Sequence, residues 1–199
     1  RLYVASIDAK DIRTMPFSPE PVFVHGSLSR TAVLLVNLGT PAAPDARAVR
    51  RFLREFLSDP RVVEIPRVIW WPILYGLVLP LRPRKTAAKY AAIWTDDGSP
   101  LMVNSRQQAL LLRGYLGQRG LDVEVELAMR YGEPSIATAF DALRKKNVER
   151  VLVLPMYPQY SATTTASVFD AVADQLRPSR NMPEMRWIRH FHDHAGYID

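Results

Sequence analysis

Short apolar runs alternate with amphipathic stretches along this chain. Residues 31–37 and 151–154 are almost continuously apolar, which is typical of strands buried on both faces of a parallel sheet. Residues 123–129 alternate between apolar and polar side chains, and residues 185–191 are expected to form a fourth strand. Helical patterns separate these runs. The order predicts an α/β fold in which helices flank a parallel sheet.

The predicted helices are recognised by their caps and by apolar residues at helical spacing. Helices are expected to start near Asp45, Ser135 and Ser167, because these side chains suit the first position of a helix. Another is expected over residues 105–119, ended by Gly120. Four side chains of that helix are predicted to face the core: Leu111, Leu112, Tyr115 and Leu116.

The unusual residues of the chain follow the predicted strands. In open parallel sheets, ligands bind at the carboxyl ends of the strands. Those ends comprise residues 38–41, 130–132, 157–165 and 190–194. We therefore expect one rim of the sheet to hold the functional site.

The loop at residues 157–165 is rich in hydroxyls and aromatic rings and carries no charge. Such a loop suits a large, flat, partly apolar ligand, and suits a phosphate less well. Residues 37–41, Asn-Leu-Gly-Thr-Pro, are no dinucleotide fingerprint, because a second and third glycine at the required spacing are missing.

Two charged groups at this rim have alternative interpretations. Arg130 is suited to bind a ligand carboxylate, but an ion pair with Glu133 or another nearby acid explains it equally well. His190, His192, Asp193 and His194 carry donors suited to zinc, iron or nickel, and His192 and His194 share a face if the segment is extended. The same side chains are ordinary surface residues near a helix start, so no metal ligand is assigned.

The apolar segment that begins at Val68 and ends at Leu81 also allows two interpretations. Pro72, Gly76 and Pro80 interrupt it, and it is too short to span a bilayer. It fits a core helix, or a lip that contacts a membrane, because two tryptophans lie within it and basic residues follow it.

Composition narrows the classes of protein further. The 199 residues are 48% apolar and carry a net charge of +6, with the basic residues scattered rather than in a stripe. We expect no nucleic-acid partner. The chain has no cysteine, which excludes a thiolate metal site or an iron–sulfur cluster within it. Residues 1–30 are expected to form an N-terminal arm, with Met15 as the true start and residues 1–14 as an artefact.

Five motifs together resemble ferrochelatase of the bacterial type, the enzyme that inserts Fe(II) into a porphyrin in haem synthesis. The resemblance runs from about Ala32 to Ile198. The motifs are Val-Asn-Leu-Gly-Thr-Pro at 36–41, Phe-Leu-Ser-Asp-Pro at 56–60, Ile-Trp-Thr-Asp-Asp-Gly-Ser-Pro at 93–100, Ala-Met-Arg-Tyr-Gly at 128–132 and Leu-Pro-Met-Tyr-Pro-Gln-Tyr-Ser at 154–161.

The resemblance implies a chelatase-like fold of two similar α/β domains with a porphyrin cleft between them. Residues 31–180 would form the first domain, and residues 181–199 would begin the crossover to the second. The implied mechanism bends the macrocycle, removes protons from pyrrole nitrogens and delivers the metal. Porphyrin contacts are implied for seven residues: Leu38, Arg82, Tyr90, Ser99, Arg130, Tyr160 and Ser161.

The resemblance favours the membrane-contacting lip for residues 68–81. It also implies a cytoplasmic protein, with peripheral contact at the inner membrane. The substrates would be ferrous iron and a porphyrin, protoporphyrin IX or coproporphyrin III, with no further cofactor in this segment.

One departure limits the resemblance. The family's metal-side histidine lies in a Ser-x-His-Gly-[Ile/Leu]-Pro-like motif, which does not occur in this chain. The catalytic residues are therefore expected beyond Asp199, and none is assigned within the chain. We expect the 199-residue chain to be the N-terminal half of the enzyme, and to be inactive by itself. The alternatives are a non-catalytic tetrapyrrole-binding module and another class of small metal chelatase.

Overall fold

Four parallel strands form the central sheet. The computed structural model describes residues 17–18 and 25–199, so the expectations for residues 1–14 and most of the arm lie outside the described residues. The strands are β1 (Arg30–Gly39), β2 (Val123–Tyr131), β3 (Val148–Pro155) and β4 (Glu184–Trp187). Their spatial order is β2-β1-β3-β4, with Val33 of β1 opposite Val125 of β2 and Leu152 of β3. The predicted α/β fold is confirmed.

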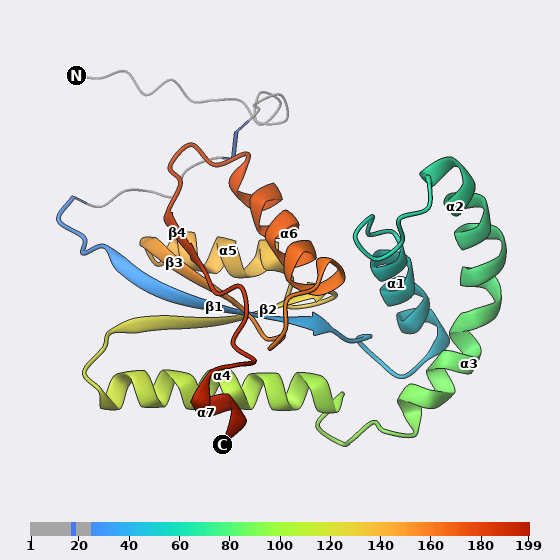
Figure 1. Cartoon of the computed structure of the whole chain (residues 1–199), viewed down its shortest axis with the longest axis horizontal. Coiled ribbons are helices and arrows are strands. Elements are labelled where there is room, and N and C mark those ends of the chain that lie inside the picture. The colour runs from blue at the N-terminus through green and yellow to red at the C-terminus, as the bar shows by residue number, and fades with distance from the viewer. Residues whose placement is uncertain (1–16, 19–24) are drawn as a thin grey trace.

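Helices cover both faces of this sheet (Figure 1). Helices α5 (Ile136–Lys145) and α6 (Ser167–Leu176) pack on one face, where β1 contributes Ala32, Leu34 and Val36 to the main core. On the other face, α4 (Pro100–Gln118) packs against β2 and β1 around Leu35 and Val125. The central strand β1 is almost wholly apolar in its interior because both of its faces are covered.

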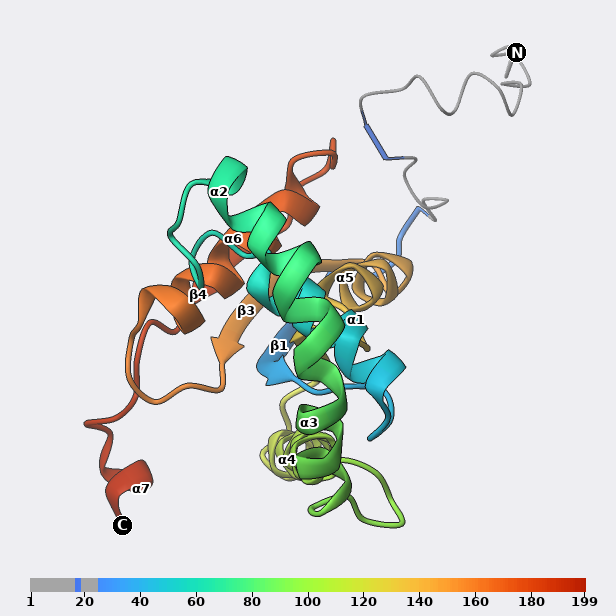
Figure 2. The same cartoon turned by 90° about the vertical axis from the view of Figure 1, so that its right-hand side faces the viewer.

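A third group of helices lies beyond the carboxyl ends of the strands. Helix α1 (Ala46–Leu57) follows β1, and the Asp45 carboxylate caps it by accepting the backbone N–H groups of Arg47 and Ala48 at 2.8 Å each. Helix α2 (Arg67–Ile73), the π-helical turn η2 (Leu74–Val78) and helix α3 (Leu79–Ala91) continue one another and pack along α1 (Figure 2). These helices therefore lie next to the edge of the sheet at which the site was predicted.

The segment from Val68 to Leu81 is helical despite its prolines and its glycine. Pro72 and Gly76 coincide with a change to π-helical geometry, which absorbs the interruption without ending the helix. Leu74 and Leu79 are buried against α1, whereas Val68 is 83% exposed and Leu81 is 67% exposed. Trp70 and Val78 also pack against this cluster, and Trp70 Nε1 donates to the Leu57 carbonyl at 2.7 Å. The remaining large apolar side chains of the segment are exposed to solvent.

Two details of the prediction were wrong. Helix α4 begins at Pro100 rather than Ser105, and Leu111 and Tyr115 are 51% and 61% exposed. The stripe that faces the sheet instead contains Ser105, Ala109, Leu112 and Leu116. Strand β4 ends at Trp187 rather than Phe191, because the N–H groups of Phe191 and His192 bond to the Pro158 carbonyl instead of continuing the strand.

The end of the chain turns away from the sheet. The π-helical turn η3 (Ala162–Ala166) leads into α6, and the short helix α7 (Ala195–Ile198) follows the turn after β4. The Asp199 N–H closes α7 by donating to the Ala195 carbonyl at 3.0 Å.

Within the described ranges, no helix combines the length and the apolar character needed to cross a bilayer. The division into an arm, a first domain and a crossover stays a prediction.

Candidate functional site at the carboxyl edge of the sheet

A cavity of about 720 Å³ opens at the carboxyl edge of the sheet. It lies between α1, the loop before α4 and the residues that follow β1 and β2. Phe52, Tyr75, Trp94 and Met102 supply apolar surface to its wall. This volume lies in the range of sites for small molecules and cofactors, which are concave and largely apolar.

Three arginines and three acidic residues line the cavity. The arginines are Arg51, Arg54 and Arg106, and the acids are Glu55, Asp97 and Glu133. In the described part of the chain, no ion pair joins any of these arginines to a carboxylate. Their guanidinium groups are therefore available to a ligand that carries carboxylates.

A buried polar network lies beside the cavity, around Asp59. The Asp59 carboxylate accepts hydrogen bonds from Arg130 Nη2 at 2.6 Å, Tyr131 Oη at 2.8 Å and Ser167 Oγ at 2.5 Å. Arg130 Nε also donates to Ser167 Oγ at 2.7 Å and to the Ser167 carbonyl at 2.9 Å. The network ties the loop after α1 to the end of β2 and the start of α6.

The network keeps Asp59 ionised. Burial raises the pKa of its carboxyl group, but the hydrogen bonds from Ser167, Tyr131 and the Arg61 backbone N–H and the charge of Arg130 outweigh burial. The net pKa lies below the ordinary value of 3.8. Burial raises the pKa of Tyr131, so its phenol remains a donor to that carboxylate.

Arg130 is thus held by an acid of the protein. The ion pair considered in the sequence exists, with Asp59 as its partner in place of Glu133. The Glu133 carboxylate instead accepts the Ser135 N–H at 2.8 Å. Contact between Arg130 and a ligand carboxylate stays a prediction.

Three of the other predicted residues lie on or beside the cavity. Ser99 is 5% exposed and lines the cavity where α4 begins. Tyr90 packs edge-on against Phe52 and Trp94, two of the residues lining the cavity, at ring distances of 6.5 and 6.4 Å. Leu38 packs into the same aromatic cluster.

Arg82, Tyr160 and Ser161 are not brought to this cavity. Arg82 is exposed on α3. Tyr160 lies on the loop after β3, where the guanidinium carbon of Arg189 is 4.4 Å from its ring centre. Ser161 accepts the Thr163 N–H at 3.3 Å and caps η3. These three residues would have to contact a different part of the ligand.

Buried hydroxyls without partners also gather at this edge. Among the described residues, Thr40, Tyr157 and Thr165 have buried side-chain oxygens that form no hydrogen bond. Thr40 follows β1, Tyr157 belongs to the loop after β3, and Thr165 belongs to η3. Buried polar groups are normally satisfied by protein atoms or by ordered water, so these three hydroxyls are candidates to bind water or a ligand.

The sequence did not identify Asp59, Tyr131 and Ser167 as site residues. Asp59 belongs to the quoted Phe-Leu-Ser-Asp-Pro motif, but an aspartate between a helix and a proline is usually a turn residue. Ser167 was expected as a helix start, and its contact with Asp59 spans 108 positions. No local pattern could have indicated this pairing.

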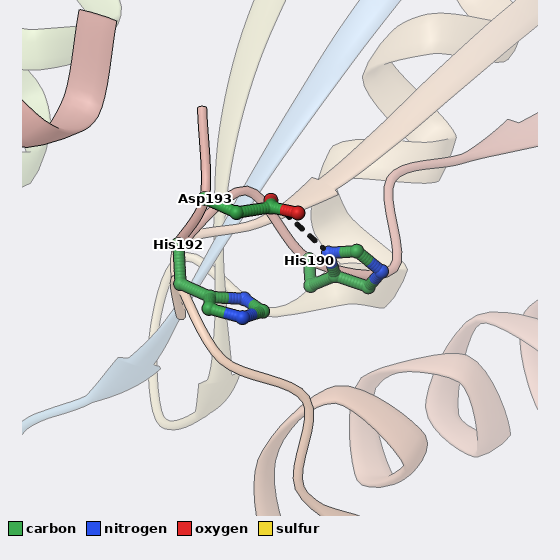
Figure 3. A group of neighbouring side chains, drawn as sticks. All are labelled: His190, His192 and Asp193. Atoms are coloured by element: carbon green, nitrogen blue, oxygen red, sulfur yellow. Dashed lines mark ion pairs between the residues drawn. The ribbon is translucent and has the colours of Figure 1, made fainter. Parts of the chain in front are cut away.

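The histidines after β4 separate into two groups. His190, His192 and Asp193 lie together, with one donor atom from each within 4.8 Å of the others (Figure 3). His194 instead accepts the Gly196 N–H at 3.2 Å and caps α7. The condition under which His192 and His194 would share a face is not met, because the chain turns at residues 191–194 rather than staying extended.

The fold and this site define a class of protein: a parallel α/β protein with a candidate ligand cavity at the carboxyl edge of the sheet. The resemblance seen in the sequence can now be compared with known proteins. The family model described as Ferrochelatase matches residues 30–199, and the chain belongs to the ferrochelatase family.

Ferrochelatases from three bacteria show the extent of this similarity. The protein of Herminiimonas arsenicoxydans is 60% identical over 184 residues, which cover 92% of this chain and 50% of that protein. The protein of Aromatoleum aromaticum is 61% identical over 181 residues, covering 90% and 50%, and that of Methylibium petroleiphilum is 60% identical over 184 residues, covering 92% and 51%. The chain spans about half the length of the curated relatives it matches, and corresponds to their N-terminal half. The location of the catalytic residues beyond Asp199 stays a prediction.

Proposed function

We propose that this chain forms one wall of the porphyrin site of a ferrochelatase, which inserts Fe(II) into protoporphyrin IX or coproporphyrin III to make haem. The observation that carries the proposal is the cavity at the carboxyl edge, with its aromatic wall and its three arginines without ion pairs. About 60% identity to proteins named ferrochelatase gives the same indication.

The chemistry of a porphyrin matches this cavity. The macrocycle is a broad apolar disc, which suits stacking and edge contacts with Phe52, Tyr75 and Trp94. Its propionates are carboxylates, for which arginine is the preferred partner. Arg51, Arg54 and Arg106 would hold these carboxylates while the ring lies against the apolar wall.

The residues implied by the resemblance fit this proposal in three groups. Leu38, Tyr90 and Ser99 would contact the ring or support its wall. Arg130 would act at the inner end, beside Asp59. Arg82, Tyr160 and Ser161 would contact the porphyrin where it extends beyond the cavity, since they lie on α3 and on the loop after β3.

A porphyrin titration tests the proposal. Binding to the chain is followed by quenching of protein or porphyrin fluorescence. Arg106→Ala should weaken binding roughly 10–100-fold, because hydrogen bonds to charged groups contribute about 1.5–3 kcal/mol. Arg177→Ala is the matched control, since Arg177 pairs on the surface with Asp174 at 2.8 Å. Equal affinities for the two variants would refute this assignment of the cavity.

We also propose that residues 68–81 contact a membrane surface peripherally, in a cytoplasmic protein. Several large apolar side chains are exposed along this segment, among them Val68, Ile69 and Leu77. Arg82, Arg84 and Lys85 follow it and suit anionic headgroups. An apolar surface bordered by tryptophan and basic residues is typical of interfacial helices.

Vesicle sedimentation tests this contact. Leu77→Ser should lower the affinity for phosphatidylglycerol vesicles about tenfold, because it removes apolar area worth about 1.5 kcal/mol. The control is Leu110→Ser on α4, where the leucine is similarly exposed. If both variants bind vesicles as well as the unaltered chain, the proposed contact is wrong.

A further inference from the structure

The turn after β4 is fixed to the loop after β3. The N–H groups of Phe191 and His192 bond to the Pro158 carbonyl at 2.9 and 3.1 Å, and the Ile188 N–H bonds to the Val153 carbonyl at 3.0 Å. The Phe191 ring also packs edge-on against Tyr197, at 5.5 Å between ring centres. The backbone that carries His190, His192 and Asp193 is therefore held on both sides.

The side chains of these three residues face a common space (Figure 3). The ring centres of His190 and His192 are 5.2 Å apart, and His190 Nδ1 lies 3.6 Å from Asp193 Oδ1. That distance exceeds a good hydrogen bond, so the pair does not saturate its donor atoms. Donor atoms around a tetrahedral metal, each about 2.1 Å from it, are about 3.4 Å apart. Small rotations of exposed side chains bring the three donors to that spacing.

The donor set is chemically specific. Two imidazoles and one carboxylate, with the other positions open, suit Fe(II) and its neighbours Co(II) and Zn(II), whereas magnesium and calcium prefer oxygen ligands. A carboxylate binds a metal ion in its ionised form, and His190, His192 and Asp193 offer one donor atom each within 4.8 Å of the others.

We propose that His190, His192 and Asp193 bind a divalent transition-metal ion, and that this surface site takes up the metal substrate at the edge of the porphyrin wall. The site lies beside the loop after β3, because Pro158 of that loop accepts hydrogen bonds from its turn and Tyr160 of the same loop stacks with Arg189. Open coordination positions and an exposed location favour rapid exchange over permanent retention. Metal binding stands by itself, whereas the uptake role rests on the proposed function.

Metal titration without porphyrin tests the site. The chain, prepared without a histidine tag, is titrated with Zn(II) by calorimetry and with Co(II) by visible absorption. His192→Ala and Asp193→Asn should each weaken binding at least about tenfold, since even outer-shell partners of a metal contribute 10–100-fold. His194→Ala is the matched control, because His194 caps α7 instead of joining the group. Circular dichroism confirms that each variant is folded.

The outcomes separate the site from the proposed function. If His192→Ala binds Zn(II) as tightly as His194→Ala does, the site is wrong, whatever the porphyrin titration shows. For the uptake role, Asp193→Asn is placed in the enzyme that contains this chain, and insertion is measured against metal concentration. The KM for the metal should rise about tenfold or more, with kcat and the KM for porphyrin unchanged. An unchanged KM for the metal overturns the uptake role.

Discussion

Asp59 organises the buried polar contacts at the carboxyl edge. Its side chain is 2% exposed, and that of its partner Arg130 is 18% exposed. A buried charge is tolerated when its partners saturate it, and removing one partner is costly. Asp59 accepts three side-chain donors through one oxygen, so the contacts of β2 and α6 with the loop after α1 depend on its charge.

We predict that Asp59→Asn destabilises the chain by roughly 3 kcal/mol, because it leaves Arg130 without its counter-ion in a mostly buried place. The control is Asp170→Asn, which removes an exposed ion pair with Arg61 at 2.7 Å and should cost less than about 1 kcal/mol. The free energy of unfolding in urea measures both. Equal losses would show that the network around Asp59 adds nothing beyond a surface pair.

The same network predicts how stability depends on pH. The folded pKa of Asp59 lies below its ordinary value of 3.8. Its contribution is therefore fully present above that value and is lost as the pH falls through the folded pKa. The difference in unfolding free energy between the unaltered chain and Asp59→Asn should be constant near neutral pH and should shrink at pH values below 3.8. A difference that grows on acidification would contradict this sign.

The sequence identified Arg130 as a functional candidate because it follows a strand. Its true partner could not be identified in this way, since Asp59 lies 71 positions earlier. Glu133 was the nearer candidate, but the turn after β2 directs its carboxylate to the Ser135 N–H. Strand ends can be inferred from a local pattern, whereas the partners of a side chain depend on how distant segments meet.

At the scale of elements, α4 shows the limit of apolar spacing as a guide. Its leucines outnumber the positions that face the sheet, so the pattern alone did not decide which of them are buried. The stripe of Ser105, Ala109, Leu112 and Leu116 keeps helical spacing, and its small residues allow α4 to approach β1 and β2 closely. Asn37 Nδ2 fixes this face by donating to Ser105 Oγ at 3.0 Å.

The end of β1 depends on Gly39. Its φ is +106°, and a Cβ built there would lie 1.8 Å from the Tyr131 carbonyl oxygen. We predict that Gly39→Ala destabilises the chain by more than about 4 kcal/mol, because β1 and β2 can no longer pair up to the cavity. Gly98→Ala is the control. The φ of Gly98 is +114°, but apart from its chain neighbours no atom lies within 4 Å of a Cβ built there. This variant should lose about 1–3 kcal/mol from backbone strain alone, and similar losses for both variants would contradict the proposed clash.

For the whole molecule, the sequence predicted the sheet and its functional edge better than it predicted the surfaces around them. Residues 31–37 and 151–154 could be assigned because strands with two buried faces tolerate few polar residues. The exposure of residues 68–81 could not be inferred in the same way. The packing of Leu74, Leu79, Trp70 and Val78 against the cluster that includes α1 shows which side of that helix is buried.

The whole-molecule prediction concerns what one wall of a porphyrin cleft can do. The resemblance places a metal-side histidine in a motif that this chain does not contain, while the cavity and its arginines belong to the chain itself. We predict that the 199-residue chain binds protoporphyrin IX but does not insert Zn(II) above the rate in protein-free solution. Zinc–porphyrin fluorescence measures insertion, and the full-length ferrochelatase of Herminiimonas arsenicoxydans, of which this chain matches 50%, is the positive control. Insertion by the chain alone would show that the histidine motif expected beyond Asp199 is dispensable. If the chain shows neither porphyrin binding nor zinc insertion, the assignment of the cavity as a porphyrin wall is wrong.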